Sequence, residues 1–99
     1  MKTVRVRPSA LSDIAEIRRY TRKAWGAAQA RSYLAGLGAQ FEAIADGTAQ
    51  SVLTDTAYRP FRRCRYKKHL IFFDETEDSV DIVRVLHPRS NLAVRLEKD

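Results

Sequence analysis

Several features that organise other small proteins are scarce or missing in this chain of 99 residues. A single cysteine excludes an internal disulfide and is typical of reducing compartments, so we expect a cytoplasmic protein. No apolar run approaches the roughly 20 residues of a membrane-spanning helix, and no secretion-type start is visible. Glycine-rich phosphate loops, serine nucleophile motifs and metal-binding spacings of cysteine and histidine are also missing. We therefore predict no metal, no cofactor and no small-molecule substrate.

Positive charge is what the chain has in excess. Its net charge is +6 and its pI is about 9.9, which indicates an anionic partner. Nucleic acid and an acidic protein both fit, and charge alone does not separate them. The apolar content of 44% and charged content of 30% are ordinary for a folded protein, so we expect one domain spanning residues 1–99.

Residues 24–44 are the segment around which the fold is predicted to form. After Gln29, apolar residues recur at three- and four-residue steps, which predicts a helix with one buried stripe, ending near Asp46-Gly47. The stripe comprises Ala30, Tyr33, Leu34, Leu37, Phe41, Ile44 and Ala45. The residues expected to face solvent are Arg31, Ser32, Gly36, Gln40, Glu42 and Ala43.

A second helix is predicted before this one. Pro8-Ser9 offers a start with a serine cap, and Asp13 is placed to favour the positive end of the helix dipole. Trp25-Gly26 is the predicted hinge, with Trp25 packed between the two helices. The buried stripe is expected to contain Leu11, Ile14, Ile17, Tyr20 (or Thr21) and Ala24.

The rest of the chain shows the two-residue period of strands. We predict an N-terminal strand and a C-terminal antiparallel meander, hence an α+β fold in which a helical hairpin packs on a small sheet and a short tail or helix follows. The predicted strands are 2–7, 61–66, 69–73 and 80–86, with turns at 67–68 and 74–79 and a surface loop at 48–60.

The last predicted strand is apolar on both faces. Val80, Ile82 and Leu86 are expected to point one way, and Val83 and Val85 the other. A strand buried on both sides needs a second cover besides the helices. That cover is either another protein chain or the tail, with its apolar residues Leu92, Val94 and Leu96.

The most basic segment carries aromatic residues between its cations. It contains Arg59, Arg62, Arg63, Arg65, Lys67 and Lys68, interleaved with Tyr58, Phe61 and Tyr66. On a strand, Phe61, Arg63 and Arg65 share one face, while Arg62, Cys64 and Tyr66 share the other. Cys64 is expected in the core. The cations either guard a sheet edge against unwanted pairing or bind an anion, with aromatic side chains available for stacking.

Three motifs carry a resemblance to a known family. They are Trp25-Gly26-x-x-Gln29-Ala30-x-x-Tyr33, the stretches 62–64 and 69–73, and the closing Ile82-Val83-Arg84-Val85-Leu86-His87. In combination they resemble the ParE branch of the RelE/ParE toxin superfamily, the toxins of type II toxin–antitoxin pairs. The resemblance runs from the first strand to about Asn91, and it implies one RelE/ParE-like domain with a role in plasmid stabilisation.

The resemblance implies a toxin that inhibits DNA gyrase by protein–protein binding, without being an enzyme. A ribbon-helix-helix antitoxin of ParD type is expected to neutralise it in a hetero-oligomer, with a helix on the helix pair and an acidic segment on the basic strand. The implied antitoxin-binding residues are Ile14, Ile17, Trp25, Tyr33, Arg62, Arg63, Arg65, Tyr66, His69, Phe72 and Arg84. The implied gyrase-binding, toxicity residues are His87, Arg89, Asn91, Leu92, Arg95 and Leu96.

The alternative is a ribosome-dependent mRNA endonuclease of RelE type. Cleavage through the 2′-hydroxyl needs a base, an acid and cations, which Arg63, Arg84, Tyr66, His69 and His87 can supply in principle. His87 can equally be structural, because it precedes Pro88 at a bend. The nuclease branch typically has a tyrosine or histidine after the last strand, and residues 88–96 hold neither. We therefore favour the binding toxin. A degenerate toxin that binds only its antitoxin is a third reading.

Overall fold

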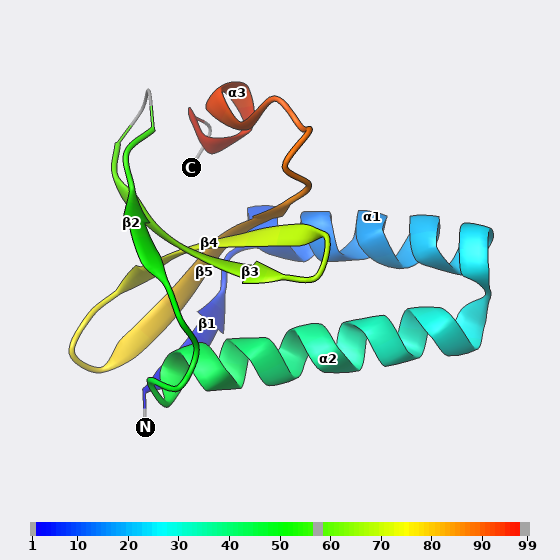
Figure 1. Ribbon diagram of the computed structural model, residues 1–99, viewed down its shortest axis with the longest axis horizontal. Helices are drawn as coiled ribbons and strands as arrows, with labels where there is room; N and C mark the ends of the chain where they lie inside the picture. The colour runs from blue at the N-terminus through cyan, green and yellow to red at the C-terminus, as the bar shows by residue number, and fades with distance from the viewer. Residues whose placement is uncertain (1, 57–58, 98–99) are drawn as a thin grey trace.

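The computed structural model describes residues 2–56 and 59–97, and confirms the α+β fold (Figure 1). In the described part of the chain, no helix is long and apolar enough to cross a membrane. The elements in order are β1 (Thr3–Val6), α1 (Pro8–Trp25), α2 (Ala27–Ala45), β2 (Val52–Thr54), β3 (Phe61–Tyr66), β4 (His69–Glu75), β5 (Ser79–Leu86) and α3 (Leu92–Glu97).

The five strands form one mixed sheet in the order β1-β5-β4-β3-β2. The predicted meander β3-β4-β5 is confirmed, and β1 joins it by parallel pairing with β5. The predicted loop at 48–60 is partly wrong, because β2 lies within it and pairs antiparallel with β3. Three residues are too few to show a two-residue period, so this strand left no sequence signal. The 74–79 turn is also shorter than predicted, because β4 runs to Glu75.

The helical hairpin turns at Gly26, whose φ of +96° is a backbone conformation that favours glycine. Pro8 opens α1, and no side chain caps it, so the predicted serine cap is wrong. The predicted stripe of α1 is confirmed in part, since Ile17 and Thr21, the alternative to Tyr20, are buried and Ile14 is half-buried. It is wrong for Leu11 and Tyr20, which are 56% and 71% exposed, and for Ala24, which is also exposed. Figure 1 shows the closed end of the hairpin extending beyond the sheet.

The predicted stripe of α2 is confirmed, since each of its members is buried or half-buried. Two of the residues expected to face solvent instead contact the sheet. Gly36 lies against the ring of Tyr66, and Gln40 Nε2 donates a hydrogen bond to Cys64 Sγ at 3.0 Å. Cys64 is buried, as predicted. Tyr66 and Cys64 of β3 therefore both contact α2 on the side that was expected to face solvent.

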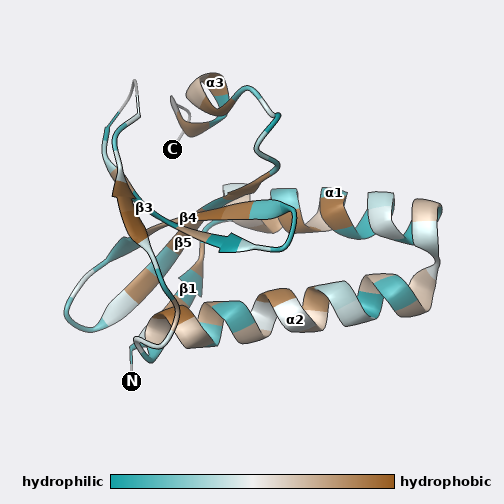
Figure 2. Ribbon diagram, viewed as in Figure 1, coloured by the Kyte–Doolittle hydropathy of each residue, from teal (hydrophilic) through white to brown (hydrophobic). Residues whose placement is uncertain are grey.

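Two apolar clusters lie on opposite faces of the sheet. Figure 2 shows that the central strands carry much of this apolar sequence. The cluster beneath the hairpin contains Ala10, Ile17, Leu37, Phe41, Ile44, Ala45, Cys64, Ile71, Phe73, Val80, Ile82 and Val85. The cluster beneath α3 contains Phe61, Leu70, Phe72, Val83, Leu86 and Leu96, with Leu92 packed against it.

The second cover of β5 was predicted to be either the tail or another protein chain, and in the structure the tail supplies it. Leu96 is 1% exposed, while Val94 is 47% exposed and points away. The predicted faces of Val85 and Leu86 are exchanged. The pairing of β4 with β5 shifts register between Phe72 and Phe73, and such a bulge reverses the alternation beyond it.

Candidate partner-binding cleft

A cleft of about 650 Å³ lies between the helical hairpin, the β3–β4 turn and the segment that follows β5. Its lining joins parts of the chain that are far apart in sequence, so it exists only in the folded protein. The lining residues are Asp13, Glu16, Ile17, Tyr20, Thr21, Trp25, Gln29, Tyr33, Lys67, Lys68, His69, Val85, Leu86, His87, Ser90 and Arg95. Aromatic rings and cations are thus combined in one open site.

The hairpin contributes exposed aromatic side chains. Trp25 is 68% exposed, so the prediction that it packs between the helices is wrong. Gly26 turns the chain directly after Trp25, and both Trp25 and Tyr20 lie at the wall of the cleft. Large aromatic residues that remain exposed in a concave site mark a binding surface more often than a structural one.

Tyr33 of α2 and His69 of β4 form another wall of the cleft. The Tyr33 hydroxyl and His69 Nδ1 are 2.6 Å apart, within hydrogen-bond distance. The Tyr66 hydroxyl donates to the backbone oxygen of Tyr33 at 3.0 Å, which holds this part of α2 against the sheet. Burial raises the pKa of Tyr33, and a hydrogen bond from the Lys68 backbone partly opposes this. The Tyr33 hydroxyl is therefore protonated at neutral pH.

The two histidines meet in the cleft, with ring centroids 6.0 Å apart in an edge-to-face arrangement. Burial lowers the pKa of His69, and the proximity of His87 lowers it further, against an opposing effect of Asp13. His69 is therefore mainly neutral at physiological pH. The Arg89 backbone N–H donates to His87 Nδ1 at 3.0 Å, as expected for a histidine at a bend before proline.

A buried ion pair lies beneath the cleft. Arg84 donates to both carboxylate oxygens of Asp13, at 2.7 and 2.8 Å, and the Val85 N–H donates to the same carboxylate at 3.0 Å. Arg84 Nη1 also donates to the Arg95 backbone oxygen at 2.7 Å. The predicted dipole role of Asp13 is wrong, because the helix turns this carboxylate into the core. Arg84 is only 8% exposed, so its guanidinium lies beneath the surface of the cleft.

Cations dominate the rim. Lys67 and Lys68 form the β3–β4 turn, with Lys67 at a φ of +50°, and Arg95 faces the cleft from α3. The Lys67 ammonium lies 5.6 Å from the Tyr33 ring centroid and 5.5 Å from that of Tyr66. Glu16 is the one acidic group on the described rim, since Asp13 is paired. Acidic groups on a partner therefore match this rim.

The predicted antitoxin-binding residues lie in four places, apart from Arg84, which lies beneath the cleft. Ile17, Trp25, Tyr33 and His69 line the cleft, with Tyr66 directly behind them. Ile14 packs in the hairpin core, and Phe72, 1% exposed, lies on the opposite face. Arg62, Arg63 and Arg65 stand along β3, away from the cleft, and Tyr58 of the basic segment lies outside the described residues.

The predicted toxicity residues are also divided. His87 and Arg95 line the cleft, while Arg89 and Asn91 are exposed outside it. Leu92 and Leu96 pack beneath the sheet, so their side chains serve as cover in this conformation. Sequence reasoning missed Tyr20 as a cleft residue. The sequence predicts Tyr20 or Thr21 in the buried stripe, and Thr21 is the one that is buried.

The described residues hold no group of three potential metal ligands. The cleft combines exposed aromatic rings, two histidines and a tyrosine hydroxyl in one open site. Its aromatic wall, neutral His69 and cationic rim suit a segment that carries apolar and acidic side chains together.

Comparison with known proteins gives consistent findings. The family described as "ParE toxin of type II toxin-antitoxin system, parDE" matches residues 4–92. Toxin ParE1 of Caulobacter vibrioides is 31% identical over 96 residues, covering 97% of this chain and 99% of that protein. Toxin ParE of Escherichia coli is 33% identical over 86 residues, covering 86% and 84%.

The fold has a solved counterpart. A chain of the structure titled "Chromosomal ParDE TA system from P. aeruginosa" superposes with a TM-score of 0.74 at 12% identity, covering 88% of this chain and 96% of that one. At this identity the likeness concerns the fold alone.

Proposed function

The chain belongs to the ParE toxin family of type II toxin–antitoxin systems, and from this premise we propose that it inhibits DNA gyrase by binding it and is neutralised by a ParD antitoxin. The toxin binds gyrase and stabilises its cleaved complex with DNA. It works as a binding protein and not as an enzyme. The antitoxin is of the ribbon-helix-helix type and forms a hetero-oligomer with the toxin.

One observation carries the mechanism of neutralisation. Trp25, Tyr33 and His69 of the antitoxin-binding set line the same cleft as His87 and Arg95 of the toxicity set. An amphipathic antitoxin helix that fills the cleft covers both sets, with its apolar face on the aromatic wall and acidic groups toward Lys67, Lys68 and Arg95. Neutralisation then follows from steric occlusion, with no change of fold required.

The decisive experiment measures supercoiling by purified gyrase with and without the toxin. We expect inhibition together with accumulated cut DNA. A matched pair of variants locates the surface, since Arg95→Glu lies in the cleft and Arg89→Glu lies outside it with the same change of charge. We expect the larger loss of inhibition with Arg95→Glu. Uninhibited gyrase at saturating toxin would exclude the proposal.

A second pair of variants tests antitoxin binding by calorimetry with a ParD antitoxin that neutralises the chain. Trp25→Ala removes a cleft residue, whereas Leu11→Ala removes an exposed apolar residue of α1 outside the cleft. We expect Trp25→Ala to weaken binding at least about tenfold, as loss of a central aromatic contact does. Equal effects of the two variants would place the antitoxin elsewhere.

The endonuclease alternative has one observation in its favour, namely that His69 and His87 meet beside two lysines. A primer-extension assay of messenger RNA on translating ribosomes separates the two functions. Cleavage that His69→Gln abolishes, with unimpaired gyrase, would favour the nuclease. We expect intact messenger.

A further inference from the structure

The positive charge of the chain is concentrated at the closed end of the helical hairpin. Residues 17–41 contain five cations and no carboxylate, so this stretch carries five of the chain's six net positive charges. The cations, all exposed, form what we call the basic tip: Arg18, Arg19, Arg22, Lys23 and Arg31. Figure 1 shows this end of the hairpin extending beyond the sheet, far from the acidic turn between β4 and β5. The molecule therefore has a strongly positive end.

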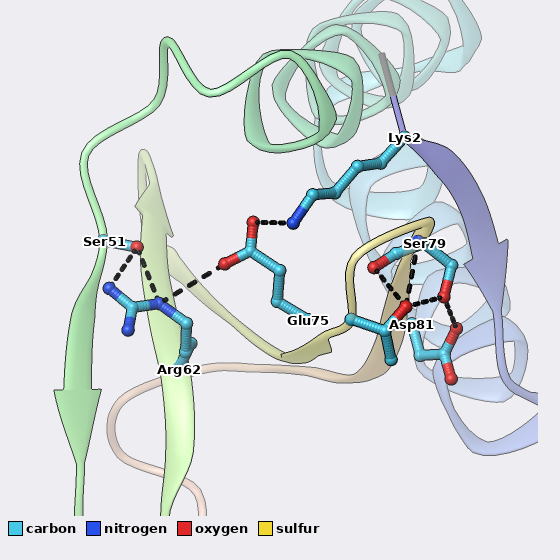
Figure 3. Close-up of polar contacts among 7 residues, drawn as sticks. Lys2, Ser51, Arg62, Glu75, Ser79 and Asp81 are labelled. Atoms are coloured by element: carbon cyan, nitrogen blue, oxygen red, sulfur yellow. Dashed lines mark hydrogen bonds and ion pairs between the residues drawn. The ribbon is translucent and has the colours of Figure 1, made fainter.

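The cations of the basic tip are not neutralised within the described part of the chain. No described residue forms a hydrogen bond or an ion pair with the charged group of any of the five. Cations near the sheet differ, because Lys2 lies 2.8 Å from Glu75 (Figure 3). Arg62 lies 4.0 Å from the same carboxylate and donates to Ser51 Oγ at 3.2 Å. The charge of the basic tip is therefore available to an anionic partner.

Four of these cations form two adjacent rows on α1. Arg18 and Arg22 are four residues apart, as are Arg19 and Lys23, and residues four apart lie on the same side of a helix. The buried residues of α1 occupy the other side. Like charges at this spacing repel one another and destabilise a helix, so the fold gains nothing from the rows. They span about 8 Å of helix axis, a length over which one DNA strand presents about two to three phosphates.

The surroundings of the rows suit a polyanion better than a membrane or a folded protein. The apolar side of α1 packs in the core, so it cannot enter lipid. Protein interfaces are anchored by large side chains that become buried. Between the cations of α1 lie only Tyr20, which lines the cleft, and buried Thr21. Phosphates need charge and donors alone, and an arginine can bind two phosphate oxygens at once.

We propose that the basic tip binds the phosphate backbone of duplex DNA without reading its sequence. Phosphate contacts of this kind position a protein on DNA and give an affinity that falls steeply with salt. None of the five cations lines the cleft, so this surface is separate from the one assigned to protein partners. The choice of DNA over RNA rests on the proposed function, because a gyrase inhibitor acts beside duplex DNA. The basic tip then holds the toxin on the DNA next to gyrase.

Fluorescence anisotropy with a labelled duplex of about 20 base pairs tests the proposal at salt concentrations between about 50 and 200 mM. We expect the logarithm of the association constant to fall with the logarithm of the salt concentration, with a slope of about −3 to −4 for four neutralised phosphates. Arg18→Glu combined with Arg22→Glu is expected to weaken binding at least about tenfold at about 150 mM salt and to reduce the slope by about two. Arg18→Lys combined with Arg22→Lys keeps the charge and should retain the slope, which separates lost charge from lost fold.

Arg5→Glu combined with Arg65→Glu is the matched control. Both residues are exposed, they lie on β1 and β3, and the change of net charge is the same. We expect this variant to weaken binding less than about threefold at about 150 mM salt, where charges more than about 8 Å from the DNA are largely screened. Equal losses in the two double variants would show that DNA responds to the total charge of the chain, and would overturn the basic tip as its site.

Other polyanions test the identity of the partner. The same assay is run with an RNA duplex of the same sequence, with polyglutamate and with vesicles that contain phosphatidylglycerol. We expect the DNA duplex to bind most tightly. Tighter binding of polyglutamate or of vesicles, lost in the Arg18→Glu, Arg22→Glu variant, would assign the basic tip to an acidic protein or to a membrane and overturn the proposal. Tighter binding of the RNA duplex would overturn the choice of DNA.

Supercoiling assays on the same variants separate this inference from the proposed function. A chain that inhibits gyrase but binds DNA equally well with and without the cations of the basic tip would contradict only the DNA site. A chain that binds DNA through the basic tip but leaves gyrase unaffected would contradict only the gyrase proposal.

Discussion

The two faces of the sheet are covered by very different amounts of chain. Two helices of 18 and 19 residues lie on one face, and α3, with six residues, lies on the other. The longer cover projects beyond the sheet, and the cleft lies toward its closed end at Gly26, whereas the shorter cover leaves a groove of about 190 Å³ between β2 and α3. One residue joins the two faces, because Arg84 binds Asp13 of α1 and the backbone of Arg95 in α3.

The largest effect is expected where the two faces are joined. Asp13→Ala leaves the guanidinium of Arg84 buried without its carboxylate, and such a loss costs about 3–5 kcal/mol of unfolding free energy. Urea denaturation followed by circular dichroism measures it. Glu75→Ala breaks the ion pair between Lys2 and Glu75, whose side chains are 28% and 35% exposed respectively. This variant is expected to lose less than about 1 kcal/mol of unfolding free energy. Similar losses in both variants would show that burial of the pair is unimportant.

The stability of the cover formed by α3 is expected to depend heavily on one side chain. Leu96 is 1% exposed and closes the apolar cluster beneath α3, so Leu96→Ala is expected to cost about 2–5 kcal/mol. Val94→Ala on the same helix removes a 47% exposed side chain and should change stability by less than about 0.5 kcal/mol. Both values come from chemical denaturation. If Leu96→Ala is as mild as Val94→Ala, α3 is not a cover in solution.

The packing of the helical hairpin on the sheet can be tested at two glycines of α2. A Cβ at Gly36 would meet the ring of Tyr66, whereas a Cβ at Gly38 meets nothing within 4 Å. Gly36→Ala is therefore expected to cost about 1–3 kcal/mol through overpacking. Gly38→Ala should stabilise the protein by up to about 1 kcal/mol, because alanine favours the helix. Thermal unfolding monitors both variants.

A Tyr66→Phe background tests whether Tyr66 causes the loss of stability in Gly36→Ala. Removing the hydroxyl that crowds Gly36 should reduce the cost of Gly36→Ala, while the effect of Gly38→Ala stays unchanged. An unchanged cost of Gly36→Ala in that background would mean that Tyr66 is not the neighbour that limits this position.

The same comparison explains which parts of the fold could be predicted from the sequence. The stripe of α2 was predictable because its seven members are apolar and all are buried or half-buried. The stripe of α1 was predictable only in part, because Ile17 and the alternative member Thr21 are buried, whereas apolar Leu11 is exposed and polar Asp13 is buried. Apolar periodicity alone gives no reason to bury an aspartate. Burial of Asp13 depends on a partner 71 residues away, which no local spacing indicates.

Other features of the fold left no clear signal in the sequence. β2 is only three residues long, too short to show a period. The register shift between β4 and β5 skips Val83 and has no sequence mark, so Val85 and Leu86 were assigned to the wrong faces. The motif at Trp25 was predicted as a hinge with its tryptophan buried, and only the hinge is confirmed. Trp25 was expected between the helices, and the turn at Gly26 leaves it exposed at the cleft.

The smallest expected effect concerns the pH dependence of the cleft wall. Burial holds the pKa of His69 in the folded chain below its ordinary value of 6.5, so the folded state disfavours the protonated imidazole. As pH falls below about 6.5, the unfolded chain takes up this proton before the folded chain does, and the unfolding free energy decreases. Above that pH the imidazole is neutral in both states and the contribution is fully present. Denaturation at a series of pH values between 8 and 5 measures the slope, and His69→Gln should lack the part due to this residue. An equal slope in the variant would show that His69 is as accessible to protons when folded as when unfolded, and the cleft wall would then be as open as the rim.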